Sequence, residues 1–127
     1  MAYVGIVLIS HSPKIAEGVK DLIRQVITDV PIETAGGTDD GGIGTSFPKI
    51  QTAIERADNG RGVLVFYDIG SAKMNAEMAT EMTDAERVKL LEAPIVEGAY
   101  VAAVEAGMAK AMEEVAEAVN KAFSESE

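Results

Sequence analysis

The sequence contains no cysteine and no tryptophan, and its only histidine is His11. The absence of cysteine excludes disulfide bonds, thiolate chemistry and iron–sulfur clusters, and one histidine cannot supply the cluster that zinc or haem requires. A metal site is therefore not expected. No apolar run approaches the roughly 18 consecutive residues of a membrane-spanning helix, so no membrane partner is expected either.

Basic residues are also scarce. Lysine and arginine together number 11, against 21 aspartates and glutamates, and the formal net charge is −10. A protein that binds nucleic acid needs concentrated positive charge to neutralise backbone phosphates, so nucleic acid is excluded as a partner. We interpret the acidic residues of the last third of the chain as solvated helix faces.

The length of 127 residues suits one domain with a buried core, and we predict a single domain over residues 1–127. The first residues, "YVGIVLIS", have neither the basic flank nor the small-residue cleavage site of a signal peptide. We therefore expect a cytoplasmic protein.

Apolar, β-branched runs alternate along the chain with segments of helical spacing. The runs that predict strands are 4–9, 31–35, 62–68 and 88–94. Helices are predicted where apolar residues recur every three or four positions: Ile15, Val19, Leu22, Ile23, Val26 and Ile27; Phe47, Ile50, Ile54 and Ala57; Met74, Met78 and Met82; residues 94–107; and Met108, Met112, Val115, Val119 and Phe123. This alternation predicts an α/β fold with a doubly wound, parallel four-stranded sheet in the order 2-1-3-4.

The methionines of the predicted helices have two interpretations. At helical spacing they indicate core filling more than a cofactor slot. The last helix is expected to pack either on the sheet or on a second copy of the chain, and residues 124–127 are expected to fray.

The predicted topology brings His11 and Asp68 together. In a sheet of this order, ligands bind beyond the carboxyl ends of strands 1 and 3, which are the strands that end at these two residues. An aspartate that accepts a hydrogen bond from one imidazole nitrogen fixes the tautomer and leaves the other nitrogen as a nucleophile. The carboxylate would also stabilise the ring once it is positively charged.

Glycines and hydroxyl side chains follow strands 2 and 3. The loop "GGTDDGGIGTS", residues 36–46, ends in Thr45 and Ser46 as expected caps of the next helix, and "DIGSA" places Gly70 and Ser71 after strand 3. Backbone N–H groups and hydroxyls are the donors that phosphoryl oxygens seek. The residues thus indicate a site for a phosphoryl group on His11.

Other interpretations of these residues remain open. A single histidine is often structural, and the loop at 36–46 lacks the lysine and spacing of a P-loop. Because no strand-linked G-x-G-x-x-G motif occurs either, bound ATP or NAD is disfavoured. Asp39 and Asp40 indicate a turn more than a metal ligand pair. The residues alone therefore predict an α/β domain that handles phosphate, but they do not identify the pathway in which it acts.

Three segments in order, "VLISHSPKIAEGV", "AGGTDDGGIGTS" and "VFYDIGSAKMNAEMA", resemble the phosphotransfer subunits of phosphoenolpyruvate-dependent dihydroxyacetone kinases. These belong to the mannose-type enzyme IIA family of the bacterial phosphotransferase system. The resemblance implies that His11 accepts a phosphoryl group from phospho-HPr and passes it to ADP on the kinase's nucleotide-binding subunit, with Asp68 as the partner of His11. The pocket would be lined by Gly36, Gly37, Gly44, Thr45, Ser46, Gly70 and Ser71.

The resemblance further implies a homodimer, and a chain that binds no cofactor of its own because the nucleotide stays on the partner subunit. Sugar-transport relatives usually have glycine after the histidine, where this chain has Ser12. This difference favours the kinase branch over sugar uptake, and a regulatory, phosphate-responsive domain is the remaining alternative. Lys14 and Lys73 either steer phosphate or an acidic partner, or are solvated surface residues.

Overall fold

The computed structural model describes residues 2–83 and 87–123. Residues 124–127, which were expected to fray, lie outside this range. The elements are β1 (Gly5–Ser10), α1 (Pro13–Arg24), β2 (Ile32–Gly36), α2 (Phe47–Ala57), β3 (Val63–Tyr67), the 3-10 helix η1 (Gly70–Ala72), α3 (Lys73–Glu81), β4 (Val88–Leu90), α4 (Ile95–Gly107) and α5 (Met112–Phe123).

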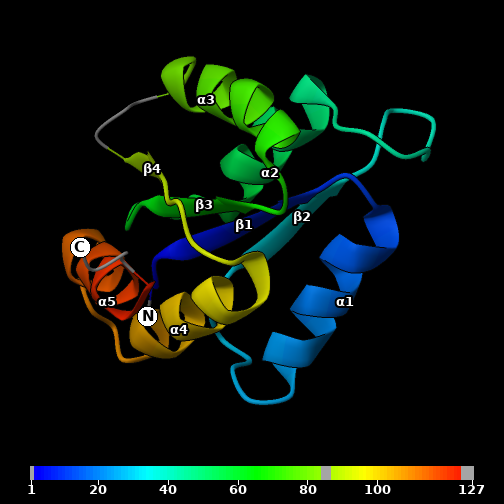
Figure 1. Cartoon of the computed structure of the whole chain (residues 1–127). Coiled ribbons are helices and arrows are strands. Elements are labelled where there is room, and N and C mark those ends of the chain that lie inside the picture. Colours follow the sequence, from blue (N-terminus) through cyan, green and yellow to red (C-terminus); the bar gives the residue numbers. More distant parts are fainter. Residues whose placement is uncertain (1, 84–86, 124–127) are drawn as a thin grey trace.

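The four strands form one sheet in the order β2-β1-β3-β4, and every neighbouring pair is parallel. The predicted α/β class and strand order are therefore confirmed. Since β1 and β3 are the central neighbours, the segments after them emerge side by side from the same edge of the sheet (Figure 1).

Helices cover both faces of the sheet, and each face has its own apolar core. Along β1, Ile6 and Leu8 point into the core beneath α1, α4 and α5, whereas Val7 and Ile9 point into the core beneath α2 and α3. This alternation follows from the two-residue period of a strand and explains why β1 is buried throughout.

The predicted helix start after β1 is confirmed. Ser12 is the N-cap of α1, its hydroxyl accepts a hydrogen bond from the Ile15 N–H at 3.3 Å, and Pro13 occupies the first helical turn. Serine satisfies an N–H that has no partner inside the helix, and proline needs no such partner. The residues next to His11 thus fix where α1 begins.

The interpretation of the α3 methionines as core residues is wrong. Met74, Met78 and Met82 are 72%, 45% and 64% exposed. The small side chains of Ala72, Ala76 and Ala79 face the sheet instead and are fully buried. Alanines let α3 lie close to the sheet, and that orientation turns the methionines outward.

Several further apolar residues were also misplaced by spacing alone. Helix α1 packs through Ala16, Val19 and Ile23, so Ile15 and Leu22 are exposed. Residues 26 and 27 lie beyond the end of α1, and Val26 is exposed. Ile43, an apolar residue of the glycine-rich loop, is also exposed.

The C-terminal helices differ from expectation mainly at their boundaries. Helix α5 begins at Met112, so Met108 lies in the α4–α5 connection and is 59% exposed. Met112, Val115 and Val119 are buried in the core with α4 and the sheet, which decides that α5 packs within its own chain. Strand β4 ends at Leu90 and is shorter than the predicted 88–94 run, whose last residue, Pro94, is the N-cap of α4.

Candidate functional site

His11 and Asp68 meet as the topology predicts. Nδ1 of His11 lies 3.0 Å from Oδ1 of Asp68, although the two residues are 57 positions apart in the sequence. The contact exists because β1 and β3 are paired in register, with Ile9 opposite Tyr67, so the next residues of both strands are neighbours.

Asp68 accepts three further hydrogen bonds besides the one from the imidazole, and these hold it in place. Its Oδ2 accepts from the His11 backbone N–H at 3.0 Å and from the Ser10 hydroxyl at 2.8 Å. Its Oδ1 accepts from the Ile69 N–H at 2.7 Å as well as from the imidazole. Partial burial raises the pKa of Asp68, but these hydrogen bonds outweigh burial and lower its pKa below the usual 3.8. The carboxylate is therefore charged at neutral pH.

Ser10 is a member of the site that the sequence analysis missed. It is fully buried, its hydroxyl donates to Asp68, and its oxygen accepts the Ser12 N–H at 3.0 Å. The one signal available in the sequence was a hydroxyl at the end of an otherwise apolar strand. Ser10 links the carboxylate to the start of α1.

The contacts of the imidazole fix its tautomer. A charged carboxylate can only accept, so Nδ1 of His11 carries the ring proton. The other nitrogen, Nε2, then has a free lone pair and accepts a hydrogen bond from the Ser71 hydroxyl at 2.7 Å. The side chain of His11 remains 20% exposed. An unprotonated nitrogen thus points to the surface at the carboxyl edge of the sheet.

The glycine-rich loop is fastened to this edge through its backbone. Gly37 N–H donates to the Ser10 carbonyl at 3.0 Å, and Gly44 N–H donates to the His11 carbonyl at 2.8 Å. Gly44 has a φ of +142°, a backbone conformation that residues other than glycine rarely adopt. Gly36 lies against the start of α1, where a Cβ would be 2.6 Å from Pro13 Cα.

The two expected caps at the end of this loop have different roles. Ser46 is the N-cap of α2, and its oxygen accepts the Lys49 N–H at 3.3 Å. Thr45 does not cap the helix, since Ser46 occupies that position. Its hydroxyl accepts instead from Asn75 Nδ2 at 2.8 Å, which ties the loop to α3. Gly70 and Ser71 are the first residues of η1, which begins two positions after Asp68.

The other charged candidates lie in ordinary surface arrangements. Asp40 accepts from the Thr38 hydroxyl and the Gly42 N–H, which is the turn that the sequence indicated. Lys73 forms an ion pair with Glu92, and Lys14 is exposed. Within residues 2–83 and 87–123, no group of three or more histidines, cysteines or acids is arranged to hold a metal ion. None of the helices described is long and apolar enough to cross a membrane.

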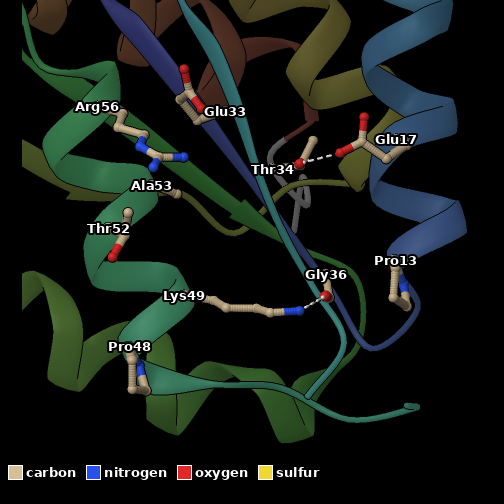
Figure 2. Close-up of a pocket in the computed structure, with 10 residues that line it drawn as sticks. All are labelled: Pro13, Glu17, Glu33, Thr34, Gly36, Pro48, Lys49, Thr52, Ala53 and Arg56. Carbon is tan, nitrogen blue, oxygen red and sulfur yellow. Dashed lines mark hydrogen bonds between the residues drawn. The ribbon is translucent and has the colours of Figure 1, made fainter. Parts of the chain in front are cut away.

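A cleft of about 440 Å³ opens beside the site, between α1, β2 and α2. Figure 2 shows Lys49 reaching across it to the Gly36 carbonyl, at 3.0 Å, and Thr34 donating to Glu17. The cleft contains both signs of charge and His11 is not among the residues that line it. His11 therefore lies outside this cleft, and one fifth of its side-chain surface is exposed.

Comparison with known proteins points to one family. A family model described as "PTS system fructose IIA component" matches residues 5–119. This range contains every strand, all of α1 to α4 and most of α5.

Two similar proteins have assigned roles. The phosphotransferase subunit DhaM of the PTS-dependent dihydroxyacetone kinase of Lactococcus lactis subsp. lactis (strain IL1403) is 48% identical over 107 residues, which cover 81% of this chain and 84% of that protein. The phosphoryl donor subunit DhaM of PEP-dependent dihydroxyacetone kinase 1 of Listeria innocua serovar 6a (strain ATCC BAA-680 / CLIP 11262) is 47% identical over 112 residues, or 88% of this chain and 89% of that protein.

A solved structure has the same fold. The crystal structure of EF1359, a protein of unknown function, superposes with a TM-score of 0.84 at 34% sequence identity, and the match covers 95% of each chain.

Proposed function

The chain belongs to the family of PTS system fructose IIA components, and from this membership we propose that it is the phosphoryl donor subunit of a PEP-dependent dihydroxyacetone kinase. His11 takes a phosphoryl group from phospho-HPr and passes it to ADP on the kinase's nucleotide-binding subunit. The ATP formed there then phosphorylates dihydroxyacetone. The two DhaM relatives support this branch of the family.

The observation that carries the proposal is the pair of contacts on the His11 ring. With Nδ1–H donating to Asp68 and Nε2 facing the surface, Nε2 is the nucleophilic atom. Its lone pair attacks the phosphorus of phosphohistidine on HPr. A new P–N bond forms, and the old P–N bond breaks with its electron pair returning to the donor imidazole. No proton has to enter or leave during this step.

Asp68 and Ser71 have complementary roles in this transfer. Phosphorylation of Nε2 leaves the His11 ring positively charged, and the carboxylate beside Nδ1 stabilises that charge. The Ser71 hydroxyl, which donates to Nε2 before the reaction, is placed to donate to a phosphoryl oxygen afterwards. We assign Gly36, Gly37, Gly44, Thr45, Ser46 and Gly70 to the remaining surroundings of the phosphoryl group. The N–H groups of Gly37 and Gly44 serve to hold the loop against Ser10 and His11.

The return step uses the same geometry. An oxygen of the β-phosphate of ADP attacks the phosphorus, the P–Nε2 bond breaks, and Nε2 regains its lone pair. The chain itself holds no nucleotide in this scheme. Such a carrier works in the cytoplasm, where ADP and phosphoenolpyruvate are found.

A reconstituted transfer assay tests the proposal. Phosphoenolpyruvate, enzyme I, HPr and this protein are mixed, the nucleotide-binding subunit with ADP and the dihydroxyacetone-binding subunit are added, and dihydroxyacetone phosphate is measured. Product is expected with the unaltered chain and none with His11→Ala. Labelled phosphate shows where the group goes in the same mixture. If it reaches His11 but is transferred only to a sugar permease, the chain functions in sugar uptake and not in the kinase pathway. Label that moves to no acceptor would favour a regulatory domain.

The proposal includes a homodimer. It is supported by the outer face of α4, where Val96 is 39% exposed and forms an apolar cleft with Tyr100, Val101 and Phe123. Light scattering during size-exclusion chromatography is expected to give twice the chain mass of 13.4 kDa. The chain mass itself would refute this part of the proposal and leave the transfer chemistry unaffected.

A further inference from the structure

The helical segment that carries Ser71 begins without a side-chain cap. η1 continues directly into α3, and neither Ile69 nor Ala72, the two N-cap residues, accepts a hydrogen bond through its side chain. On the buried side, Ala72 and Ala76 fix the segment against the sheet. Ser71 itself is exposed. Its position beside His11 therefore depends on contacts that the segment makes outside the apolar core.

One such contact comes from Asn75, which follows Ser71 by one helical turn. Residues four positions apart lie on the same side of a helix, so the two side chains face the same direction. Nδ2 of Asn75 donates to the hydroxyl oxygen of Thr45 at 2.8 Å, and the Ser71 hydroxyl is 2.7 Å from Nε2 of His11. Both side chains are thus directed at the segments that surround the imidazole.

Thr45 is in turn held close to His11. Its neighbour Gly44 donates a backbone N–H to the His11 carbonyl at 2.8 Å. On its other side, Ser46 is buried and forms the N-cap of α2. A residue between two such anchors has little freedom to move. Thr45 is therefore a fixed point from which Asn75 can be positioned.

Together these contacts close a ring around the reacting side chain. From the His11 carbonyl the ring passes to Gly44 and Thr45, crosses to Asn75, follows one helical turn back to Ser71 and returns to His11 at Nε2. The crossing is short because α2 and α3 lie side by side on the same face of the sheet (Figure 1). The Asn75–Thr45 hydrogen bond joins two side chains of this ring without touching the reacting nitrogen.

We propose that Asn75 is a positioning residue for phosphoryl transfer at His11. It acts through Ser71: by holding η1 against the glycine-rich loop, it keeps the Ser71 hydroxyl beside Nε2, where that hydroxyl can donate to a phosphoryl oxygen. A displacement of about 1 Å at a reacting group is enough to slow a transfer up to roughly a hundredfold. This inference rests on the proposed carrier function and adds Asn75 to the residues that serve it.

Replacement of Asn75 by alanine tests the role. Alanine has a higher helix propensity than asparagine, so Asn75→Ala removes the link without weakening α3. The rate of His11 phosphorylation is measured against HPr concentration, with phosphoenolpyruvate and enzyme I in excess. We expect kcat to fall about tenfold while KM for HPr changes less than about twofold, because the loss affects the reacting atoms and not the binding of HPr. Asn120→Ala, the same substitution at an exposed position of α5, is the matched control and should change neither constant.

A double-mutant cycle assigns the effect to the Asn75–Thr45 contact. Thr45→Val removes the accepting oxygen and keeps the shape of the side chain. If the two residues act as one link, adding Asn75→Ala to Thr45→Val should lower kcat by less than about twofold. A further tenfold loss would mean that Asn75 acts independently of Thr45, and it would overturn the inference.

The ¹⁵N chemical shift of His11 Nε2 measures the positioning without any phosphoryl transfer. The shift of an unprotonated imidazole nitrogen depends on whether a donor is hydrogen-bonded to it, and Ser71→Ala gives the signal for a nitrogen without this donor. Asn75→Ala is expected to move the Nε2 signal toward that of Ser71→Ala, whereas Asn120→Ala should leave it in place. Circular dichroism of every variant checks that the fold is retained.

The outcomes separate this inference from the proposed function. If HPr does not phosphorylate the unaltered chain, the carrier function fails and the inference fails with it. If the unaltered chain is phosphorylated and Asn75→Ala has the same kcat as Asn120→Ala, the carrier function stands and the positioning role is wrong. A lower kcat with an unchanged Nε2 signal would also overturn the inference, because Asn75 would then act without Ser71. An increase in KM alone would instead place Asn75 in the surface that binds HPr.

Discussion

At the scale of single residues, the chemistry of His11 is decided by what its neighbours can accept. Asp68 has no proton to donate, so it requires the ring proton on Nδ1 and leaves Nε2 with the lone pair of the proposed nucleophile. Ser10 and two backbone N–H groups prevent the carboxylate from turning away. Three hydrogen bonds on Asp68 thus hold the carboxylate in position beside Nδ1 of His11.

Asp68→Asn should separate the electrostatic role of Asp68 from its role in folding. An amide can present a donor to Nδ1, which favours the wrong tautomer, so we expect phosphorylation of His11 to slow by at least tenfold. The fold should remain because the amide has nearly the shape of the carboxylate. Phosphorylation rates and circular dichroism are measured on the same samples, and an unchanged rate would contradict the assigned role.

The effect of Asp68→Asn on the free energy of unfolding should depend on pH. Because hydrogen bonds hold the pKa of folded Asp68 below its ordinary 3.8, the charged form is favoured by folding. Its contribution to stability is complete above the ordinary pKa and is lost as pH falls through the lower, folded pKa. The difference in unfolding free energy between the unaltered chain and Asp68→Asn should therefore shrink below about pH 4.

Urea unfolding from pH 7 down to pH 2 measures this difference. Asp21→Asn on α1 is measured in parallel, to account for the removal of one negative charge from an acidic chain. A difference that grows as the pH falls would have the opposite sign and would contradict the hydrogen-bond explanation.

At the scale of elements, the position of His11 depends on how closely β2 approaches the start of α1. The approach is possible because Gly36 has no side chain: a Cβ there would lie 2.6 Å from Pro13 Cα and 3.0 Å from the Ser12 carbonyl. Both contacts are backbone atoms, which cannot rotate away. The first turn of α1 and the end of β2 therefore fit together only with glycine at this position.

A pair of alanine substitutions tests this fit. Gly36→Ala should lower the unfolding free energy by about 1–3 kcal/mol, because the start of α1 has to move. Gly70→Ala is the comparison, since a Cβ at Gly70 meets no heavy atom within 4 Å and its φ is ordinary. Its unfolding free energy should change by less than about 0.5 kcal/mol. Chemical denaturation measures both, and equal losses would mean that close packing at Gly36 is unimportant.

At the scale of the whole molecule, two apolar cores are joined by one sheet. The core with α1, α4 and α5 and the core with α2 and α3 do not share helices, but both use alternate residues of β1 and β3. Loss of either core exposes one face of the same central strands. We therefore expect the described domain to unfold in a single cooperative transition.

Matched isoleucine substitutions test this coupling. Ile23 on α1 and Ile50 on α2 are both fully buried, one in each core. Replacement of either by alanine should cost about 2–5 kcal/mol and move the same single transition. Val26→Ala is the control, since Val26 is exposed. Two separated transitions in circular dichroism, with only one shifted by each variant, would show that the cores unfold independently.

The sequence by itself determined the order of strands and helices, the cap at Ser12 and the pairing of His11 with Asp68. These features follow from local patterns, namely continuous apolar runs and residue spacing, combined with the rule that parallel strands end at one edge. Apolar strands that must be covered on both faces fit few folds other than a parallel sheet between two layers of helices. The prediction of the strand order was therefore well constrained.

Only the tertiary structure decided which helix faces are buried and which nitrogen of His11 carries the ring proton. Helix α3 has both alanines and methionines at helical spacing, and close packing on the sheet selects the alanines. Ser10 acquires its role only because β3 brings Asp68 beside it. Burial and hydrogen bonding depend on contacts between distant segments, and a local pattern contains no information about which segments will meet.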